Sequence, residues 1–532
     1  MNAFNRLLTS AAIGLAVAVT SAPAGFAETP ANMLVIANRI DDITTLDPAE
    51  SFEFAGSDVS RNVYQKLVNF DPNDLDAGYQ PEVAESWDVS DDGKTITFTI
   101  RDGLTFHSGN PVTAADVEYS LRRAVILNKT PSFILTQFGF SAENVEQTIV
   151  ADGNTVTIVT DQPYATSFVL NCLTATIGGI VDMKTVMANE VDGDMGNTWL
   201  KTNTAGSGAY KLVSWKPNDS VTLQSNPGYY RGAPAMERVI VRHVQESASQ
   251  RLLLERGDID IARNLNPEDV AGASSAEGIK VIDELKGRLM YASLNQKHPI
   301  LSKPEVRQAF KYLVDYEGMQ NSFLKGQYTI HQNFLPKTYL GASNEAPFTY
   351  DVAKAKELLA AAGVDGLEIE VGVREAQERI EIAQSLQNSL AQVGIKMNIT
   401  VGTAKQILAR YRSRELDVYL GAWGPDYPDP QTNAGTFAYN PDNSDAAQAT
   451  GLLAWRNAWD TDGLTPLVDA AVTENDRDAR IQMYKDIQAK FRETSPFVIM
   501  FQQIEQSAMR DNVTNFSTGQ AITSASYWQV TK

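Results

Sequence analysis

The chain has 532 residues, of which 43 % are hydrophobic and 21 % charged, and its formal net charge is −20. A chain of this length is too long for one hydrophobic core, so two or more lobes are expected. The negative charge argues against nucleic acid and anionic membranes as partners, but it does not imply a cationic ligand, because the charge inside a cleft can differ from that of the whole surface.

The first predicted element is a secretory signal peptide. Arg6 supplies its positive charge, residues 7–19 are its short apolar run, and small residues precede a cleavage site after Ala27. The apolar run is too short to span a membrane, and no later stretch approaches about 20 apolar residues. The residue directly after the cleavage site is not a cysteine, so we expect a free periplasmic protein without a lipid anchor.

Short strands and turns are predicted over the first part of the mature chain. Residues 33–38 form an apolar strand, and residues 51–57 form a loop of polar and aromatic side chains. A turn then leads into a strictly alternating strand at residues 95–100. After it, Thr113 is placed to cap a helix whose first turn contains Asp116. No catalytic chemistry is visible in this region.

Two further blocks have recognisable local patterns. Residues 206–232 contain a glycine turn and two strand patterns joined by a short turn, which predicts a hairpin. Residues 288–319 predict a strand and then a helix, and Pro304 suits the first turn of that helix. The apolar stripe of the helix is typical of a core-facing side.

Strands and helices alternate regularly over residues 351–430. The apolar spacing predicts strands at residues 367–373, 395–401 and 418–423, with a helix in each of the two connections. A further helix, capped by Asp351, precedes the first strand. This β-α-β-α-β order predicts three parallel strands joined by right-handed crossovers.

Two charged residues lie at the carboxyl ends of these strands. Arg374 follows the first strand, and Asp426 lies in the loop after the last one. Ligands of open α/β sheets bind at this edge, and a cation and an anion on one rim suit a zwitterion. Two structural alternatives stay open, because Asp426 can be a simple turn residue and Arg374 can pair with Glu375 or Glu378.

The blocks at 81–121, 206–232 and 288–319 resemble, in order and spacing, the family 5 extracellular solute-binding proteins, which are the dipeptide-, oligopeptide- and nickel-type receptors of ABC importers. One departure is Ala209, where the family usually has proline. The resemblance implies an α/β fold with two lobes, the type II periplasmic-binding-protein fold in its large peptide-receptor variant. The expected division is a signal peptide at 1–27, lobe I at 28–75, 205–289 and 499–532, an extra subdomain of lobe I at 76–204, and lobe II at 290–498.

The resemblance also assigns roles to residues of the rim. In dipeptide-type receptors a tryptophan, followed three residues later by an aspartate, binds the α-ammonium group of the peptide, and Trp423 and Asp426 match this pattern. An arginine after the preceding strand binds the α-carboxylate, and Arg374 stands within about one residue of that register. Arg379, at the start of the next helix, is the alternative.

Aromatic residues are the remaining candidates for the ligand-binding site. Trp423 and Tyr427 can form a wall of the cleft or belong to the core of the lobe. By the resemblance, Phe52, Glu53 and Phe54 face the cleft from the other lobe.

The implied function is that of a periplasmic receptor that captures a peptide or peptide-like zwitterion by closure of its two lobes. Hinge strands are expected near residues 290–295 and 498–502. The expected partners are the small-molecule ligand and the permease subunits of an ABC importer, and we expect a monomer without cofactor, metal or catalytic residues. An opine, an oligosaccharide or a nickel chelate is the alternative ligand, and His331 is the residue that a nickel chelate could use.

A secreted hydrolase is the alternative from another class. Ser322 and Lys325 form an SxxK pattern, but no convincing KTG partner accompanies it. The four histidines lack the spacing of a zinc site. Cys172 is the only cysteine, so no intramolecular disulfide is possible, and a buried apolar role is expected for it.

Overall fold

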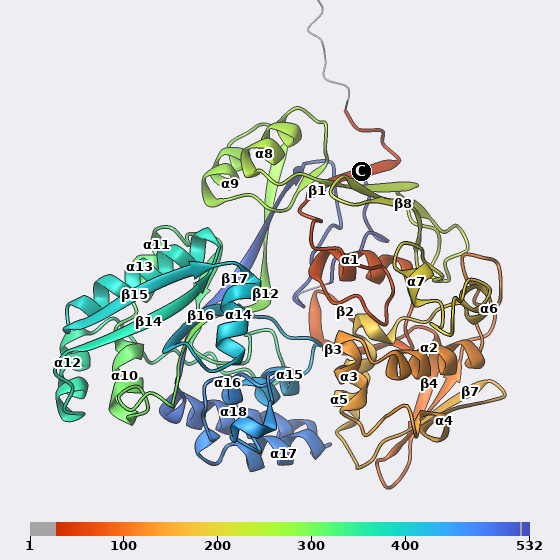
Figure 1. The fold of residues 1–532 in the computed structure, drawn as a ribbon. Helices are drawn as coiled ribbons and strands as arrows, with labels where there is room; N and C mark the ends of the chain where they lie inside the picture. Colours follow the sequence, from red (N-terminus) through yellow and green to blue (C-terminus); the bar gives the residue numbers. More distant parts are fainter. Residues whose placement is uncertain (1–27, 522–523) are drawn as a thin grey trace, which may run out of the picture.

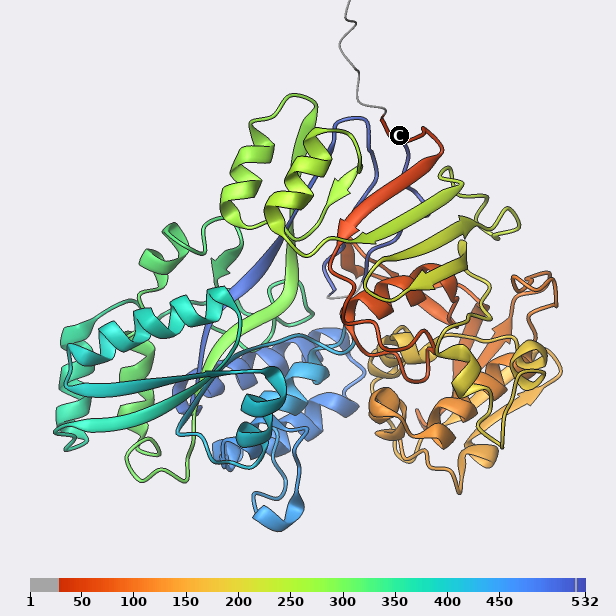
Figure 2. The same cartoon turned by 45° about the horizontal axis from the view of Figure 1, so that its top comes forward.

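The structure, a computed structural model, describes residues 28–521 and 524–532, so the predicted signal peptide lies outside the described residues. Two bodies stand side by side and are connected by long strands (Figures 1 and 2). We call the body around β14 (Leu367–Arg374) lobe II and the body around β1 (Met33–Asn38) lobe I; the residue bounds predicted for the lobes stay a prediction. Within the described ranges, no helix combines the length and the apolar character that crossing a membrane requires.

One mixed sheet continues through both lobes. Its strands lie in the order β15 (Ile395–Gly402), β14, β16 (Val418–Trp423), β12 (Ile279–Leu294), β17 (Phe497–Arg510), β11 (Ile261–Ala262), β1, β10 (Arg238–His243), β9 (Ser220–Ser225) and β8 (Tyr210–Lys216), and β13 (Tyr328–Ile330) pairs with β17 off this path. β8 and β9 form the predicted hairpin. The antiparallel β12–β17 ladder shifts register between Leu285 and Leu289, where the two strands pass from one lobe to the other. This irregularity lies just before the hinge predicted at 290–295, and hinge motion there stays a prediction.

Lobe II confirms the predicted β-α-β-α-β unit. β14 pairs in parallel with both β15 and β16, and the connections contain α13 (Gln377–Ala391) and α14 (Ala404–Arg412). Alternate residues of β12 face opposite sides, so Met290 packs with α10, α12 and α13 whereas Tyr291 packs with α14, α15 and α18. The other helices of this lobe are α10 (Pro304–Tyr312), α11 (Tyr316–Asn321), α12 (Val352–Ala361), α15 (Pro430–Phe437), α16 (Leu453–Arg456), α17 (Thr465–Thr473) and α18 (Arg477–Thr494).

Lobe I carries a second, four-stranded sheet in the order β4 (Ala84–Val89), β5 (Thr95–Ile100), β7 (Thr155–Val159) and β6 (Ile149–Asp152). The alternation predicted for β5 is confirmed, because Ile96, Phe98 and Ile100 are buried. Helix α2 (Ala114–Leu127) packs on this sheet and shares its apolar core. The remaining elements of lobe I are β2 (Val68–Asp71), β3 (Asp74–Pro81), α3 (Phe133–Thr136), α4 (Val145–Thr148), α5 (Thr166–Leu173), α6 (Met183–Met187), α7 (Asn197–Leu200), α8 (Ser247–Glu255) and α9 (Pro267–Ser274).

The predicted cap of α2 is present as a capping box. The Asp116 amide donates to the Thr113 hydroxyl, and the Asp116 carboxylate accepts from the Thr113 amide at 2.9 Å. We expect Thr113→Ala to cost about 1 kcal/mol, because the first turn loses one acceptor. Hydrogen exchange of the α2 amides measures this locally, and unchanged protection of the first turn would contradict the prediction. Asp116→Ala should cost more, because the same carboxylate also accepts from the Met183 amide at 3.1 Å.

The loop predicted at 51–57 is wrong in its second half, because helix α1 (Phe54–Val63) begins there. The polar and small residues resemble a loop, but Ala55, Gly56 and Ser57 are all buried. Gly56 lies so close to Ser51 that an added Cβ would stand 2.8 Å from the Ser51 hydroxyl. Small residues therefore allow the helix to pack tightly inside lobe I, and tertiary contacts override the local preference.

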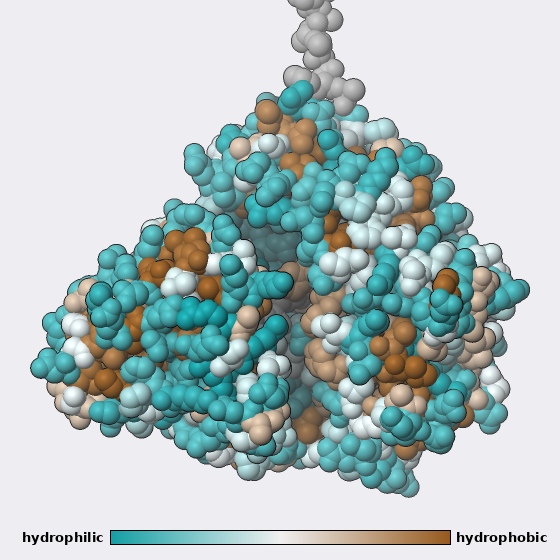
Figure 3. All heavy atoms as spheres, viewed as in Figure 1, coloured by the Kyte–Doolittle hydropathy of each residue, from teal (hydrophilic) through white to brown (hydrophobic). Residues whose placement is uncertain are grey.

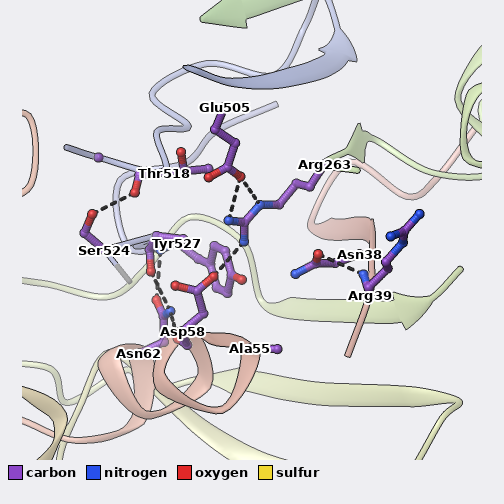
Figure 4. A network of polar contacts seen from close by, with 12 residues as sticks. Asn38, Arg39, Ala55, Asp58, Asn62, Arg263, Glu505, Thr518, Ser524 and Tyr527 are labelled. Carbon is purple, nitrogen blue, oxygen red and sulfur yellow. Dashed lines mark hydrogen bonds and ion pairs between the residues drawn. The ribbon is translucent and has the colours of Figure 1, made fainter. Parts of the chain in front are cut away.

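A buried ion-pair network joins α1 to the connecting strand β17. The Arg263 guanidinium, just after β11, donates to Asp58 of α1 at 2.7 Å and to Glu505 of β17 at 2.8 Å (Figure 4). The ammonium group of Lys286 donates to the carbonyls of Thr518 and Gly519 at 2.7 and 2.6 Å. The network therefore ties three distant segments of lobe I to the strands that lead into lobe II.

Candidate functional site

A crevice separates the two lobes, and cavities open along it (Figure 3). One cavity has a volume of about 330 Å³ and is lined by α1, by residues 174–177 and by the ends of β14 and β16. A second cavity of about 620 Å³ adjoins it. Four residues line both: Phe52, Trp423, Asp426 and Tyr427. Volumes in this range suit a small ligand.

Asp426 lies in the loop between β16 and α15. Its backbone amide donates to the Thr432 hydroxyl at 3.1 Å, which fixes the turn. Its carboxylate is half-buried in the lining of the cavities. Over residues 28–521 and 524–532, no side chain or amide donates to this carboxylate and no cation pairs with it. Burial raises the pKa of Asp426 to about 7. A buried carboxylate without a partner is costly, so an ammonium group from a ligand would be strongly favoured there.

Arg374 is the last residue of β14 and lines the same cavity. Its side chain is half-buried, and its Nε atom has no hydrogen-bond partner in the part of the chain that the structure describes. Among the described residues, the pairing with Glu375 or Glu378 that the sequence allows is not formed. Arg379 is buried in the first turn of α13, where its Nε atom lies 3.7 Å from Glu378, and it is not part of the cavity lining. Arg374, and not Arg379, thus presents its charge to the cavity.

Trp423 and Tyr427 combine the two roles that the sequence leaves open. Trp423 is half-buried, and its indole packs edge-on against Phe437 with ring centroids 6.3 Å apart. Its Nε1–H has no acceptor in the described part of the chain. Tyr427 is 6 % exposed and reaches into the apolar core of lobe I, where its ring centroid lies 5.9 Å from that of Phe168. Both rings therefore line the cavities and also pack against a neighbour.

The aromatic residues predicted for lobe I reach the cavities, whereas the acidic residue between them is engaged elsewhere. Phe52 packs edge-on against Phe133, with centroids 5.9 Å apart. Phe54 is half exposed and lines the smaller cavity. The Glu53 carboxylate accepts hydrogen bonds from the Thr44 hydroxyl at 3.2 Å and from the Phe52 amide at 3.3 Å. Glu53 therefore helps to shape the start of α1.

The lining also contains residues that were not predicted from the sequence, and three of them have titratable side chains. Arg61 and Lys66 enter the smaller cavity from lobe I, and Tyr339 enters it from lobe II. Tyr339 is buried, and its burial, with Asp426 as the next cause, raises its pKa. No local motif marks these residues, because each comes from a separate segment that only the folded chain brings to the crevice.

Residues of lobe II also contact lobe I directly beside the cavities. Arg480 forms a buried two-pronged ion pair with Asp429, at 3.0 and 2.8 Å. The same two side chains meet lobe I, because Asn171 donates to Asp429 at 3.0 Å and Arg480 donates to the Ser167 hydroxyl at 3.0 Å. The structure therefore has its two lobes in contact along one side of the crevice.

His331, the residue considered for a nickel chelate, is not among the residues that line these cavities. It is buried in lobe II, and its Nε2 atom lies 2.7 Å from the Leu335 carbonyl. Burial lowers its pKa to about 4, so the imidazole is neutral at pH 7. Within residues 28–521 and 524–532, no three histidine, cysteine, aspartate or glutamate residues group as a metal site. Cys172 is buried in the core of lobe I, as predicted.

The amino-acid sequence of this chain is similar to a family model and to known bacterial proteins. The family model described as "Bacterial extracellular solute-binding proteins, family 5 Middle" matches residues 78–445. The "Probable D,D-dipeptide-binding periplasmic protein DdpA" of Escherichia coli (strain K12) is 29 % identical over 508 residues, which is 94 % of each chain. The glutathione-binding protein GsiB of Salmonella paratyphi A is 26 % identical over 518 residues, 95 % of each chain.

Solved structures of other proteins are similar to this chain over almost its whole length. The periplasmic binding protein DppA of Helicobacter pylori, in complex with the peptide STSA, superposes with a TM-score of 0.77 at 24 % identity, covering 94 % of this chain and 98 % of that chain. This likeness confirms the two-lobed α/β fold of type II periplasmic binding proteins that the sequence predicts.

Proposed function

Because the chain belongs to the bacterial extracellular solute-binding proteins of family 5, we propose that it is the receptor of an ABC importer for a peptide or peptide-like zwitterion. The relatives DdpA and GsiB are a dipeptide- and a glutathione-binding protein by name. A periplasmic location agrees with the name of DdpA, which is a periplasmic protein. The permease subunits of the importer are the proposed membrane partners. The family consists of receptors, and we propose a binding role without catalysis.

One observation carries the choice of ligand. Asp426 and Arg374, a carboxylate and a guanidinium that form no ion pair within the described residues, line the same cavity. Desolvated charges need partners of opposite sign, and a zwitterion supplies both at once. In this proposal Asp426 accepts from the ammonium group of the ligand and Arg374 donates to its carboxylate. Trp423 and Phe52 pack against the part of the ligand that lies between its ammonium group and its carboxylate.

Closure of the lobes would complete the site. Binding energy from both lobes favours the closed arrangement, and the permease would recognise that shape. The contacts of Asp429 and Arg480 with Asn171 and Ser167 support this proposal, since they join the lobes beside the cavities. These contacts would break when the lobes separate, so they set part of the balance between the open and the closed form.

A thermal-shift screen tests the proposal. Residues 28–532 are unfolded and refolded to remove co-purified ligand, and are then mixed with short peptides, opines, oligosaccharides, and nickel with and without histidine. A ligand at one hundred times its Kd adds about 2.7 kcal/mol of stability, which gives a clear shift. We expect shifts from peptides or opines that have both a free amino group and a free carboxylate.

Blocked peptides are the matched controls. N-acetylation or C-terminal amidation of a peptide that binds should remove its shift, because each leaves one charge of the cavity without a partner. Shifts from oligosaccharides or nickel alone would overturn the choice of a zwitterion. Mass spectrometry of the recovered peptide distinguishes a receptor, which returns it intact, from a hydrolase.

A further inference from the structure

Two cations of lobe I face the same cavity as Asp426 and Arg374, and the proposed zwitterion does not use them. Arg61 lies in the last turn of α1, and Lys66 follows that helix after a short connection. Both line the cavity of about 330 Å³. The described residues of the lining therefore include three cations, Arg61, Lys66 and Arg374, but Asp426 as their only carboxylate.

Lys66 is a buried amine without a close anion. Its side chain is 5 % exposed, and within the described chain its ammonium has neither a hydrogen bond nor an ion pair. Burial, followed by the charge of Arg61, lowers the pKa of Lys66 to about 7, and Glu82 acts in the opposite direction. The nearest acidic contact is made by the backbone, because the Lys66 amide donates to Glu82 at 2.9 Å. An anion entering from the cavity would find the amine still able to donate.

Arg61 is held in place by contacts that leave its charge uncompensated. One terminal nitrogen donates to the Asn69 side chain at 3.3 Å, and the guanidinium lies over the Phe70 ring, 4.7 Å from its centroid. No carboxylate of the described residues forms an ion pair with it. The neighbouring Asp58 is a possible ion-pair partner of Arg61, but it is paired with Arg263 at 2.7 Å. The aromatic ring and the amide thus orient the guanidinium without neutralising it.

The charges around this end of the cavity have a positive sum in three of the four protonation states of Lys66 and Glu82. Lys66 and Glu82 together carry no net charge if both are charged or both are neutral, and Arg61 adds one positive charge in either case. If Glu82 alone is neutral, the net charge of these three groups is larger still, and the three charges cancel only if Lys66 alone is neutral. On the lobe II side, Arg374 and Asp426 balance each other. A ligand with one ammonium group and one carboxylate leaves Arg61 without an ion-pair partner among the described residues in any of these states.

We propose that Arg61 and Lys66 form a subsite for a second acidic group of the ligand. This inference rests on the proposed function and narrows it, because the ligand class becomes an amino-acid derivative with one ammonium group and two acidic groups. An acidic side chain of a short peptide and a second carboxylate of an opine offer the same chemistry. Such a ligand places one anion beside the two cations of lobe I and presents an ammonium group and a carboxylate to Asp426 and Arg374 of lobe II.

Matched acid and amide ligands test this inference by calorimetry. The panel holds Ala-Glu with Ala-Gln, Glu-Ala with Gln-Ala, the corresponding tripeptides, and an N-(carboxyalkyl) amino acid with its side-chain amide. These pairs have nearly the same shape and differ by one charge. We expect the acidic member of at least one pair to bind tenfold tighter or more, and the difference to decrease with added salt. Equal binding, or tighter binding of the amides, overturns the subsite and leaves the receptor function standing. No binding across the panel overturns both.

Substitutions of Lys66 and Arg61 test whether these two residues cause the preference for the acidic ligand. In Lys66→Met and in Arg61→Gln, the preference for the acid should fall to threefold or less, while the affinity for the amide changes by less than threefold. Lys66→Arg should keep the preference. Lys356→Met, which removes an equal charge from the exposed face of α12, is the control and should leave the preference unchanged. A preference that survives both lobe I variants overturns the assignment, and the wild-type comparison decides the ligand class if a variant fails to fold.

Discussion

Asp426→Asn is expected to weaken the binding of peptides with a free amino terminus by about 30-fold or more. Asparagine keeps the size of the side chain, but it removes the negative charge that would face the ammonium group of the ligand. Removing one partner of a buried charge pair costs about 2–5 kcal/mol, and each 1.4 kcal/mol is tenfold in Kd. Titration calorimetry of wild type and variant with one peptide measures the loss.

The same substitution should make the ligand-free protein more stable at pH 8. Burial raises the pKa of Asp426 to about 7 in the folded protein, well above that of an unfolded aspartate. Between these two values the folded state binds more protons than the unfolded state, so the contribution of Asp426 to stability falls as pH rises. Asparagine has no such charge. The variant should therefore melt at a higher temperature than wild type at pH 8, and the difference should shrink towards pH 5.

Opposite effects on binding and on stability identify a residue whose charge serves the ligand. A turn residue, the alternative that the sequence leaves open, would show the reverse pattern: lower stability in the variant and unchanged affinity. Binding should also acquire a pH dependence in wild type alone, weakening below pH 7 as the carboxyl takes up a proton. An N-acetylated peptide is the control, because it lacks the ammonium group and should bind both proteins with similar, low affinity.

Regular periodicity made lobe II predictable from the sequence. Apolar residues alternate along the strand at 367–373 and recur at helical spacing in the helix that follows. In addition, a parallel β-α-β unit has only one common handedness. The structure confirms the parallel pairing of β14 with β15 and β16. The position of Arg374 and Asp426 on one rim follows from this topology, which is why two charged residues 52 positions apart in the printed sequence could be placed together.

Features that depend on distant contacts were harder to predict. The loop predicted at 51–57 overlaps only the first turn of helix α1, where glycine and serine disfavour an isolated helix and burial against the rest of lobe I stabilises it. Arg61 and Lys66 depend on distant contacts in the same way, since the sequence does not reveal which cations near a helix end face solvent and which face a cavity. Strand β12 begins at Ile279, before the block in which a strand was predicted, because its polar first half is stabilised by pairing with β17.

Arg263 is the second residue at which we expect a large effect, and here the effect is on folding. Its guanidinium is 8 % exposed and donates to Asp58 and Glu505. Burial alone would lower the pKa of Arg263, but the charges of Glu505 and Asp58 outweigh burial and raise it. Arg263→Met keeps most of the volume and leaves two buried carboxylates facing one another, with Lys286 as the remaining cation. Removing one partner of a buried ion pair costs about 3–5 kcal/mol.

Differential scanning calorimetry of ligand-free wild type and variant measures this cost as a lower melting temperature of several degrees. The matched control is Lys396→Met on β15. It breaks an exposed ion pair in which the Lys396 ammonium lies 2.7 Å from the Glu368 carboxylate. Exposed pairs contribute about 0–1 kcal/mol, so the control should melt close to wild type. Equal effects of the two substitutions would contradict the structural role given to Arg263.

The pH dependence separates lost charge pairing from lost packing. The charges of Arg263 and Lys286 outweigh the burial of Glu505 and lower its pKa in the folded protein. Its contribution to stability is therefore present above the pKa of an unfolded glutamate and is lost as pH falls below it. In Arg263→Met this contribution is missing or reversed. The difference in melting temperature between wild type and variant should therefore become smaller from pH 8 towards pH 4. A gap that stays constant over this range would point to packing as the cause, because the methionine fills its space equally well at every pH.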